Sequence, residues 1–330
     1  MLIGYPAIGF ILGQIFPKYV VRHVPKFINW VGVPILVITS VRFISLTSEF
    51  WMIPIIALVA IILGAVFAMI TIDLGEINER TKALLHSAKV ISEIDINSYS
   101  KDKYTVRNKT WNSNFKFNFL VGGALGNTNN IAFPLILLGL TLDQIQYFTW
   151  AVIFDLFSTT FSLYFIAIVT SFIYKKKLRL YAYLNPIKEL FFNKIFWSLI
   201  IGLFVSSLDL PSQSIDIINQ TKNALVPICL IAIGMSLKLP KARLKLNPLV
   251  KCLLVKMLIV PLIISAFILA LNVKYLPILV ILIQVSMPPL LIDNVIRKNY
   301  NLPQDFNLAA NSVGCAILGL TVPILFVLFS

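Results

Sequence analysis

The fold is decided by residues 122–134, which read GGALGNTNNIAFP inside an otherwise apolar run. Glycine, asparagine and proline are poor helix formers, and proline also removes a backbone donor. A second apolar run is interrupted at residues 284–289, which read QVSMPP. Unpaired backbone groups in hydrocarbon cost several kcal/mol each, so such interruptions persist only where protein or a wet cavity satisfies them. The pair predicts a binding site; simple proline kinks, with the small and amide residues serving helix packing, are the alternative.

The composition places these interruptions in a membrane protein. Hydrophobic residues make up 58% of the 330 residues and charged residues only 13%, against roughly 25% in soluble proteins. These values exclude a pair of soluble domains and a disordered chain. The three cysteines lie in apolar runs, which is typical of buried residues rather than of a disulfide scaffold. Two isolated histidines predict no metal site, and we expect no cofactor.

A helix needs about 20 residues to cross some 30 Å of hydrocarbon. Ten apolar runs meet or approach this length, at residues 2–16, 27–43, 50–72, 117–140, 146–174, 191–208, 215–237, 249–271, 275–294 and 306–329. The first run is short, but no basic residue precedes it and no small-x-small cleavage site follows. We therefore expect a helix there rather than a signal peptide.

The basic residues predict the orientation of these helices. Of the 28 lysines and arginines, 24 lie in the odd-numbered connections. Lys256 lies inside the eighth run, near enough to the basic side for its stem to snorkel. The positive-inside rule then predicts a protein of the plasma (inner) membrane with both termini outside. The net charge of +14 is thus a topology signal, and no nucleic-acid partner is expected.

Weak echoes predict an internal repeat. Ile8-Gly9 corresponds to Ile201-Gly202, and Val33-Pro34-Ile35 to Val226-Pro227-Ile228, both at an offset of 193. Pro134 and Pro288 are offset by only 154. The difference between the two offsets, 193 and 154, is close to the length of a polar stretch at 73–116. Five helices per half make the repeat inverted. The prediction is an all-α membrane protein with a first repeat at 1–174, carrying a cytoplasmic insertion at 73–116, and a second at 175–330.

Several segments resemble the auxin efflux carrier family, which includes bacterial permeases and the plant PIN-formed carriers. They are GNTNNIAFPL in helix 4, PICLIAIGMSL in helix 7, MPPLL in helix 9 and NLAANSVGCAILGLTVPIL in helix 10. The resemblance implies a fold like the sodium/proton antiporters, with broken helices 4 and 9 crossing near the midplane. Helices 1, 2, 6 and 7 would form a scaffold and the others a mobile transport domain. The insertion, the short first helix and Asp293 depart from the family pattern.

The resemblance also implies a small organic anion as substrate, such as auxin or a dicarboxylate. It places the crossing prolines on Pro134 and Pro288 and the polar helix-4 residues on Asn127 and Asn130. From the breaks themselves, we expect an amide-rich substrate site whose half-helix N-termini attract the anion. Its predicted members are Asn127, Asn129, Asn130, Pro134, Gln284, Pro288, Pro289 and Asn294.

Two carboxylates are candidates for binding a coupling H+ or Na+. Asp155 is predicted near the midplane of helix 5, with Ser158, Thr159 and Ser162 following at helical spacing. A protonated Asp155 that only packs against a helix-4 asparagine is the alternative. Asp293 lies four residues before Arg297, so an interfacial ion pair competes with an ion-binding role.

The function predicted is a permease working by alternating access in the lipid bilayer, with a homodimer as a compatible assembly. A sodium-coupled symporter of the bile-acid type shares the expected fold and differs only in ion dependence. An intramembrane enzyme is the third candidate. The sequence lacks HExxH, GxGD and aspartate-rich diphosphate motifs, so we expect no enzyme.

Overall fold

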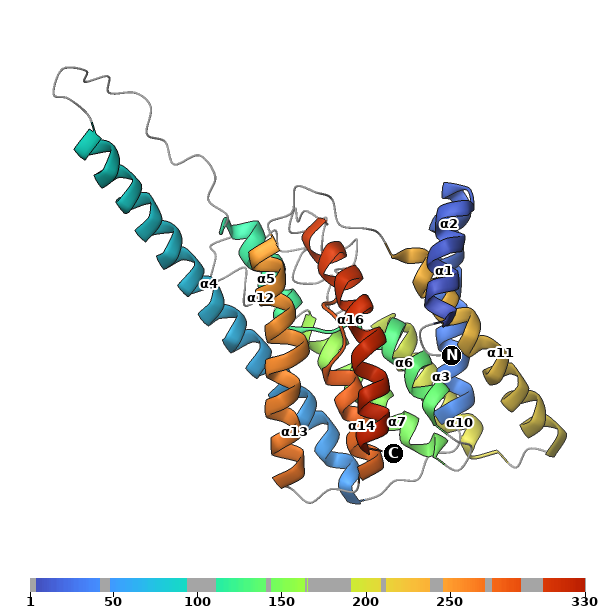
Figure 1. Ribbon diagram of the computed structural model, residues 1–330. Helices are drawn as coiled ribbons and strands as arrows, with labels where there is room; N and C mark the ends of the chain where they lie inside the picture. Colours follow the sequence, from blue (N-terminus) through green and yellow to red (C-terminus); the bar gives the residue numbers. More distant parts are fainter. Residues whose placement is uncertain are drawn as a thin grey trace.

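The computed structural model describes helices throughout (Figure 1). Within the described residues no strand is assigned, and one isolated bridge pairs two single residues. The described residues are 4–41, 48–93, 111–140, 144–163, 165, 191–208, 212–237, 246–270, 275–291 and 305–329. Within the described residues, each predicted apolar run overlaps at least one helix. The prediction of an all-helical protein is therefore confirmed for this part of the chain.

In the part of the chain that the structure describes, three helices are long and apolar enough to cross a membrane: Lys18–Val41, Met52–Glu79 and Asn247–Ala270. Two shorter apolar helices cover Thr128–Gly139 and Lys194–Ser206. Large apolar side chains on these helices face outward, including Trp30, Ile62 and Leu262 at 60% or more exposure. Such a surface is stable where lipid tails cover it.

The second helix begins earlier than the hydropathy predicted. α1 covers Gly4–Ile15, and α2 (Lys18–Phe27) continues through the π-helical η1 (Ile28–Gly32) into α3 (Val33–Val41). The hydropathy pattern predicted a basic connection at residues 17–26. That boundary was wrong because α2 is amphipathic, and a helix with charges on one face continues outside the apolar run.

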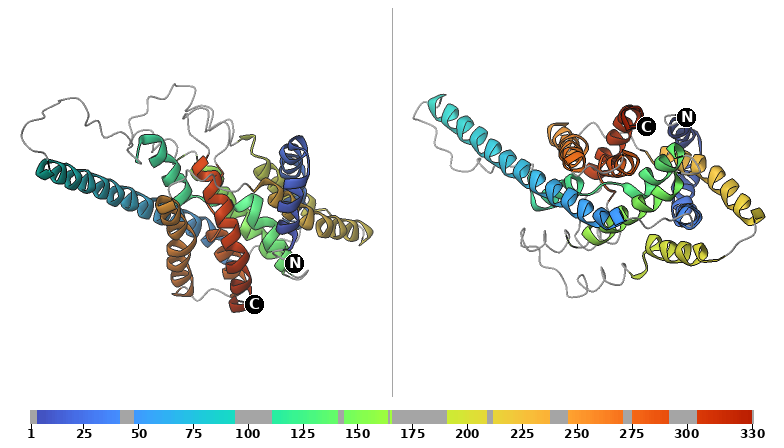
Figure 2. Two further views of the ribbon diagram at one scale, coloured as in Figure 1. Left: turned by 45° about the horizontal axis from the view of Figure 1, so that its top comes forward. Right: turned by 90° about the horizontal axis from the view of Figure 1, so that it is seen from below.

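α4 is also longer than predicted, covering Met52–Glu93 (42 residues). At 1.5 Å per residue it spans about 63 Å, twice the hydrocarbon thickness, and its end projects far from the other helices (Figure 2). Residues 73–93 are rich in Glu, Lys, Leu and Ala, which are strong helix formers. The first part of the predicted insertion is therefore helical, and residues 94–110 lie outside the described part of the chain.

The helices pack in two groups (Figure 1). In the first, α1 packs on α11 and α3 on α10; we call it the α1/α11 group. It contains α1, the α2–η1–α3 helix, α10 (Lys194–Ser206) and α11 (Ser212–Ser236). The α4/α14 group contains α4, α5 (Ser113–Ala124), η3 (Thr128–Ala132), α6 (Phe133–Gly139), η4 (Ile145–Tyr147), α7 (Phe148–Asp155), η5 (Leu156–Phe161), α12 (Leu246–Leu254), η6 (Val255–Ile259), α13 (Val260–Ala270), α14 (Tyr275–Val285) and α16 (Asp305–Phe329).

Two close helix contacts in the α1/α11 group are related by one sequence offset. Gly9 of α1 lies against the backbone of Ile231 in α11, and Gly202 of α10 lies against the backbone of Ile38 in α3. Gly9 and Gly202 are 193 residues apart, as are Ile38 and Ile231. In both contacts the missing Cβ lets two backbones approach closely, which is how small residues serve membrane helix packing.

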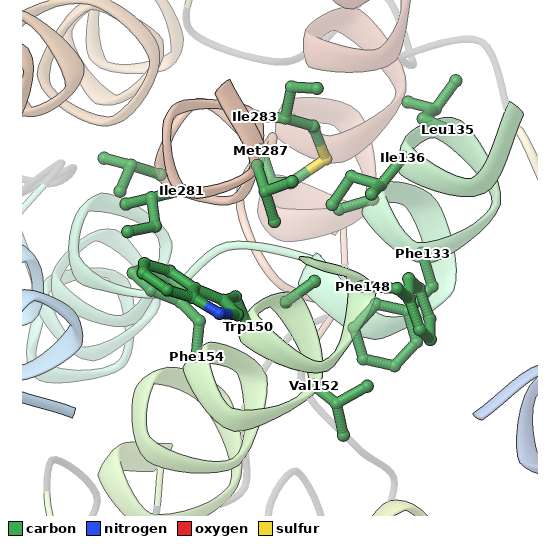
Figure 3. Packing of buried hydrophobic residues seen from close by; sticks show 14 of the residues in the cluster. Phe133, Leu135, Ile136, Phe148, Trp150, Val152, Phe154, Ile281, Ile283 and Met287 are labelled. Carbon is green, nitrogen blue, oxygen red and sulfur yellow. The ribbon is translucent and has the colours of Figure 1, made fainter. Parts of the chain in front are cut away.

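Aromatic and aliphatic side chains from α6, α7 and α14 form the centre of the α4/α14 group (Figure 3). Phe133 and Phe148 are fully buried and meet edge to face, with ring centroids 5.1 Å apart. Met287, directly after α14, is also fully buried in this cluster. This packing holds the end of α14 against the start of α6, where the two interrupted helices meet.

Candidate functional site

The two interruptions meet at their extended residues. α5 ends at Ala124 and α14 at Val285, and Gly126 pairs with Pro289 in an isolated antiparallel bridge. The Asn127 N–H donates to the Pro288 carbonyl at 2.8 Å, and the Leu290 N–H donates to the Leu125 carbonyl at 3.0 Å. Each break thus supplies hydrogen-bond partners for backbone groups of the other break. Such partners are needed because the hydrocarbon core of the bilayer offers no water to these groups. We call these paired breaks, residues 125–127 and 286–290, the crossover.

Local chemistry explains why the chain is extended here. Pro288 and Pro289 have no N–H to continue α14, and their carbonyls remain free to accept. A Cβ at Gly126 would lie 3.1 Å from both Lys256 Cε and Met287 Cβ, so only glycine lets these neighbours approach without displacement. The break falls at Leu125–Asn127, and the helix then continues from Thr128 through Pro134.

A cavity of about 220 Å³ lies beside the crossover, between the two helix groups. Its lining from the α4/α14 group and the crossover is Asn127, Asn130, Ile131, Leu291 and Asn311. The lining from the α1/α11 group is Pro25, Lys26, Ile28, Asn29, Val33, Cys229, Ala232, Ile233 and Ser236. One wall therefore belongs to each group, and the volume exceeds that of a bare ion.

The polar groups of this cavity are mostly amides. Asn130 Nδ2 donates to Asn127 Oδ1 at 3.0 Å, and Asn311 Nδ2 donates to the Pro289 carbonyl at 3.0 Å. The Asn127 amide N–H2 has no acceptor among the described residues. Lys26 adds a positive charge. The cavity thus offers a free donor and a cation within a largely apolar lining.

Asp155 does not line the cavity but contacts Thr128, the residue that follows Asn127. Its side chain is fully buried, and the Thr128 hydroxyl donates to Oδ1. Thr159 Oγ1 lies 2.6 Å from Thr128 Oγ1 and 3.4 Å from the Gly126 carbonyl. Asp155 Oδ2 has no hydrogen-bond partner among the described residues. Two hydroxyls therefore connect this carboxyl to the crossover, and one of its oxygens is free to bind a proton or an ion.

The other predicted site residues occupy different places. Gln284 is fully buried and donates from Nε2 to the Ala151 carbonyl at 3.1 Å, so it joins α14 to α7 rather than lining the cavity. Asn129 is half-buried and also lies outside the lining. Pro134 is buried within α6, seven residues beyond Asn127, and does not belong to the break. Asp293 and Asn294 lie outside the described residues.

Four residues beside the crossover or its cavity were not predicted as site residues: Lys26, Thr128, Lys256 and Asn311. Lys256 was predicted to snorkel, but it is only 4% exposed and its Nζ lies 3.4 Å from the Ala124 carbonyl. That interpretation was wrong because a neighbouring half-helix end offers the ammonium an acceptor inside the protein. Asn311 had a readable signal, since Asn307 precedes it by four residues in an apolar helix.

Among the described residues no cluster of His, Cys, Asp or Glu could hold a metal ion. The apolar helices and their outward-facing side chains are those of an integral membrane protein, and an amide-lined cavity lies between them. Residues 179–327 match the family model described as membrane transport protein. Over these residues the match agrees with the resemblance to the auxin efflux carrier family, and it supports a role in membrane transport. No curated protein matches this chain.

Proposed function

We propose that the protein is a secondary transporter that moves a small organic anion across the membrane by alternating access. The binding site is the cavity beside the crossover. The observation that carries this proposal is the cavity lining: it contains Lys26, amides and apolar side chains, and no Asp or Glu among its described residues. A negative solute gains from the cation and the amide donors and meets no like charge.

Amide donors suit a carboxylate that must also be released. A hydrogen bond to a charged group contributes about 1.5–3 kcal/mol, enough for selection without irreversible binding. Asn127 presents its free N–H2, and Asn130 orients Asn127 through their mutual hydrogen bond. The apolar residues of the lining, such as Val33 and Ile131, favour an organic body over an inorganic anion.

The position of the cavity supports alternating access. One wall belongs to each helix group, so sliding of one group past the other would expose the same residues to opposite sides of the membrane. The Gly9 and Gly202 contacts, related by an offset of 193, support the inverted relation of repeats 1–174 and 175–330. We propose ten spanning helices with the α1/α11 group as scaffold, both termini outside, and the insertion at 73–116 inside.

Asp155 is the proposed coupling residue. Its contact with Thr128 places it one residue from Asn127, so a change in its charge acts directly on the crossover. Asp293 and Asn294 remain predictions from their spacing, as coupling and substrate residues respectively.

Binding can be tested with purified protein in a thermal-shift screen against carboxylates, followed by uptake into proteoliposomes. We expect one or more organic carboxylates to raise the melting temperature, since a ligand at 100 times its dissociation constant stabilises by about 2.7 kcal/mol. Asn127→Ala and Asn130→Ala should each weaken binding about tenfold or more. Asn223→Ala, on the exposed side of α11, is the matched control. Unchanged affinity in both cavity variants would refute the site.

A further inference from the structure

A lysine lies buried beside the crossover. Lys256 belongs to η6, a π-helical segment in the middle of a candidate membrane span, and is 4% exposed. Its Nζ lies 3.4 Å from the carbonyl of Ala124, and its stem runs against Gly126. Ionisable residues inside a membrane are costly and mark functional sites by default. π-helical turns are likewise frequent at such sites.

The position of Lys256 matches the electrostatics of the broken helix. α5 ends at Ala124, and a helix C-terminus carries partial negative charge on carbonyls without helical partners. The following helix begins at Thr128, where the N-terminus carries partial positive charge, and there Thr128 contacts Asp155. A buried base therefore lies at the negative end and a buried acid at the positive end of the same break.

Lys256 has no carboxylate partner among the residues that the structure describes. Its contact is the helix-end carbonyl, which is the kind of ligand that binds a coupling sodium ion in transporters with broken helices. An ammonium and a sodium ion cannot share this place. We infer that Lys256 is the fixed countercharge of the crossover and substitutes there for a coupling cation, so that transport requires no sodium. This inference rests on the proposed transport function.

The test compares sodium with N-methylglucamine at equal ionic strength. The melting temperature of the substrate-free wild-type protein and its uptake in proteoliposomes should be the same in both. Lys256→Ser removes the ammonium and leaves space and a hydroxyl oxygen beside the Ala124 carbonyl. Sodium should raise the melting temperature of this variant by roughly 4 °C or more and partly restore uptake.

Two further variants separate charge from packing. Lys256→Met fills the space with a neutral chain, so its melting temperature should fall in both salts without a sodium response. Lys251→Ser, five residues earlier and only half-buried, should behave as wild type. These melting measurements need no substrate, so they remain decisive if no carboxylate is transported and the proposed function fails.

Three results would overturn the inference. The first is a wild-type protein whose uptake or stability depends on sodium. The second is a Lys256→Ser protein that is indifferent to sodium or cannot be obtained folded in either salt. The third is loss of substrate binding in both Lys256 variants without any sodium response, which would assign the ammonium to the substrate's carboxylate.

Discussion

Replacing Asp155 by asparagine tests whether the buried carboxyl couples transport to protons. The substitution keeps the shape of the side chain and an oxygen that can accept from Thr128. What changes is the strength of that hydrogen bond, from about 1.5–3 kcal/mol for a charged acceptor to about 0.5–1.5 kcal/mol for a neutral one. The stability of Asp155→Asn should therefore fall by about 2.5 kcal/mol at most, and the protein should remain folded.

The effect on transport should be much larger. If one proton moves with each anion, every unit of pH difference is worth about 1.4 kcal/mol and drives about tenfold accumulation. In Asp155→Asn this dependence should disappear, leaving only equilibration of the substrate. The assay is uptake into proteoliposomes with an imposed pH gradient, with the exposed Asp73→Asn on α4 as control. A wild-type response to the pH gradient in folded Asp155→Asn would refute the coupling role and leave Asp155 as a packing residue.

Three further predictions follow from named contacts. Gly9→Ala should lower the melting temperature by several degrees, because its Cβ would overlap the Ile231 carbonyl. The control Gly4→Ala should leave the melting temperature unchanged, because nothing lies within 4 Å of its added Cβ. Equal melting temperatures for the two variants would contradict the close packing of α1 and α11. Lys26→Gln should weaken anion binding by about twofold to fivefold at low salt. At high salt the effect should disappear, because salt screens the exposed charge of Lys26. Ligand titrations at two ionic strengths measure this difference. Lys101→Cys should resist an impermeant thiol reagent in intact cells and react in inverted vesicles; labelling in intact cells would reverse the proposed orientation.

The helix boundaries show which features of the fold hydropathy predicts and which it does not. Hydropathy located the membrane class and the apolar runs, because hydrocarbon excludes charged side chains over about 20 residues. It misjudged the start of α2 at Lys18 and the end of α4 at Glu93. Beyond the hydrocarbon a helix continues wherever its residues favour helix, and hydropathy does not measure this.

The crossover shows a second limit. Both interruptions could be predicted because glycine, asparagine and proline disturb a helix in any context. Which residues pair could not be predicted, because the contact joins Gly126 to Pro289, more than 160 positions apart in the sequence. The correspondence of Pro134 with Pro288 between the repeats stays a prediction, since Pro134 lies within α6 and takes no part in this contact.

Local sequence patterns were enough to predict a helical membrane protein, the places where two of its helices break, and the amides beside those breaks. These features follow from interactions of each segment with the bilayer, which act locally. Only the tertiary structure decided that Lys256 meets the end of α5, that Thr128 joins Asp155 to the crossover, and that Lys26 and Asn311 line one cavity. Each of these contacts depends on which faces of distant helices are packed together. A local sequence pattern does not indicate which distant helix a segment packs against.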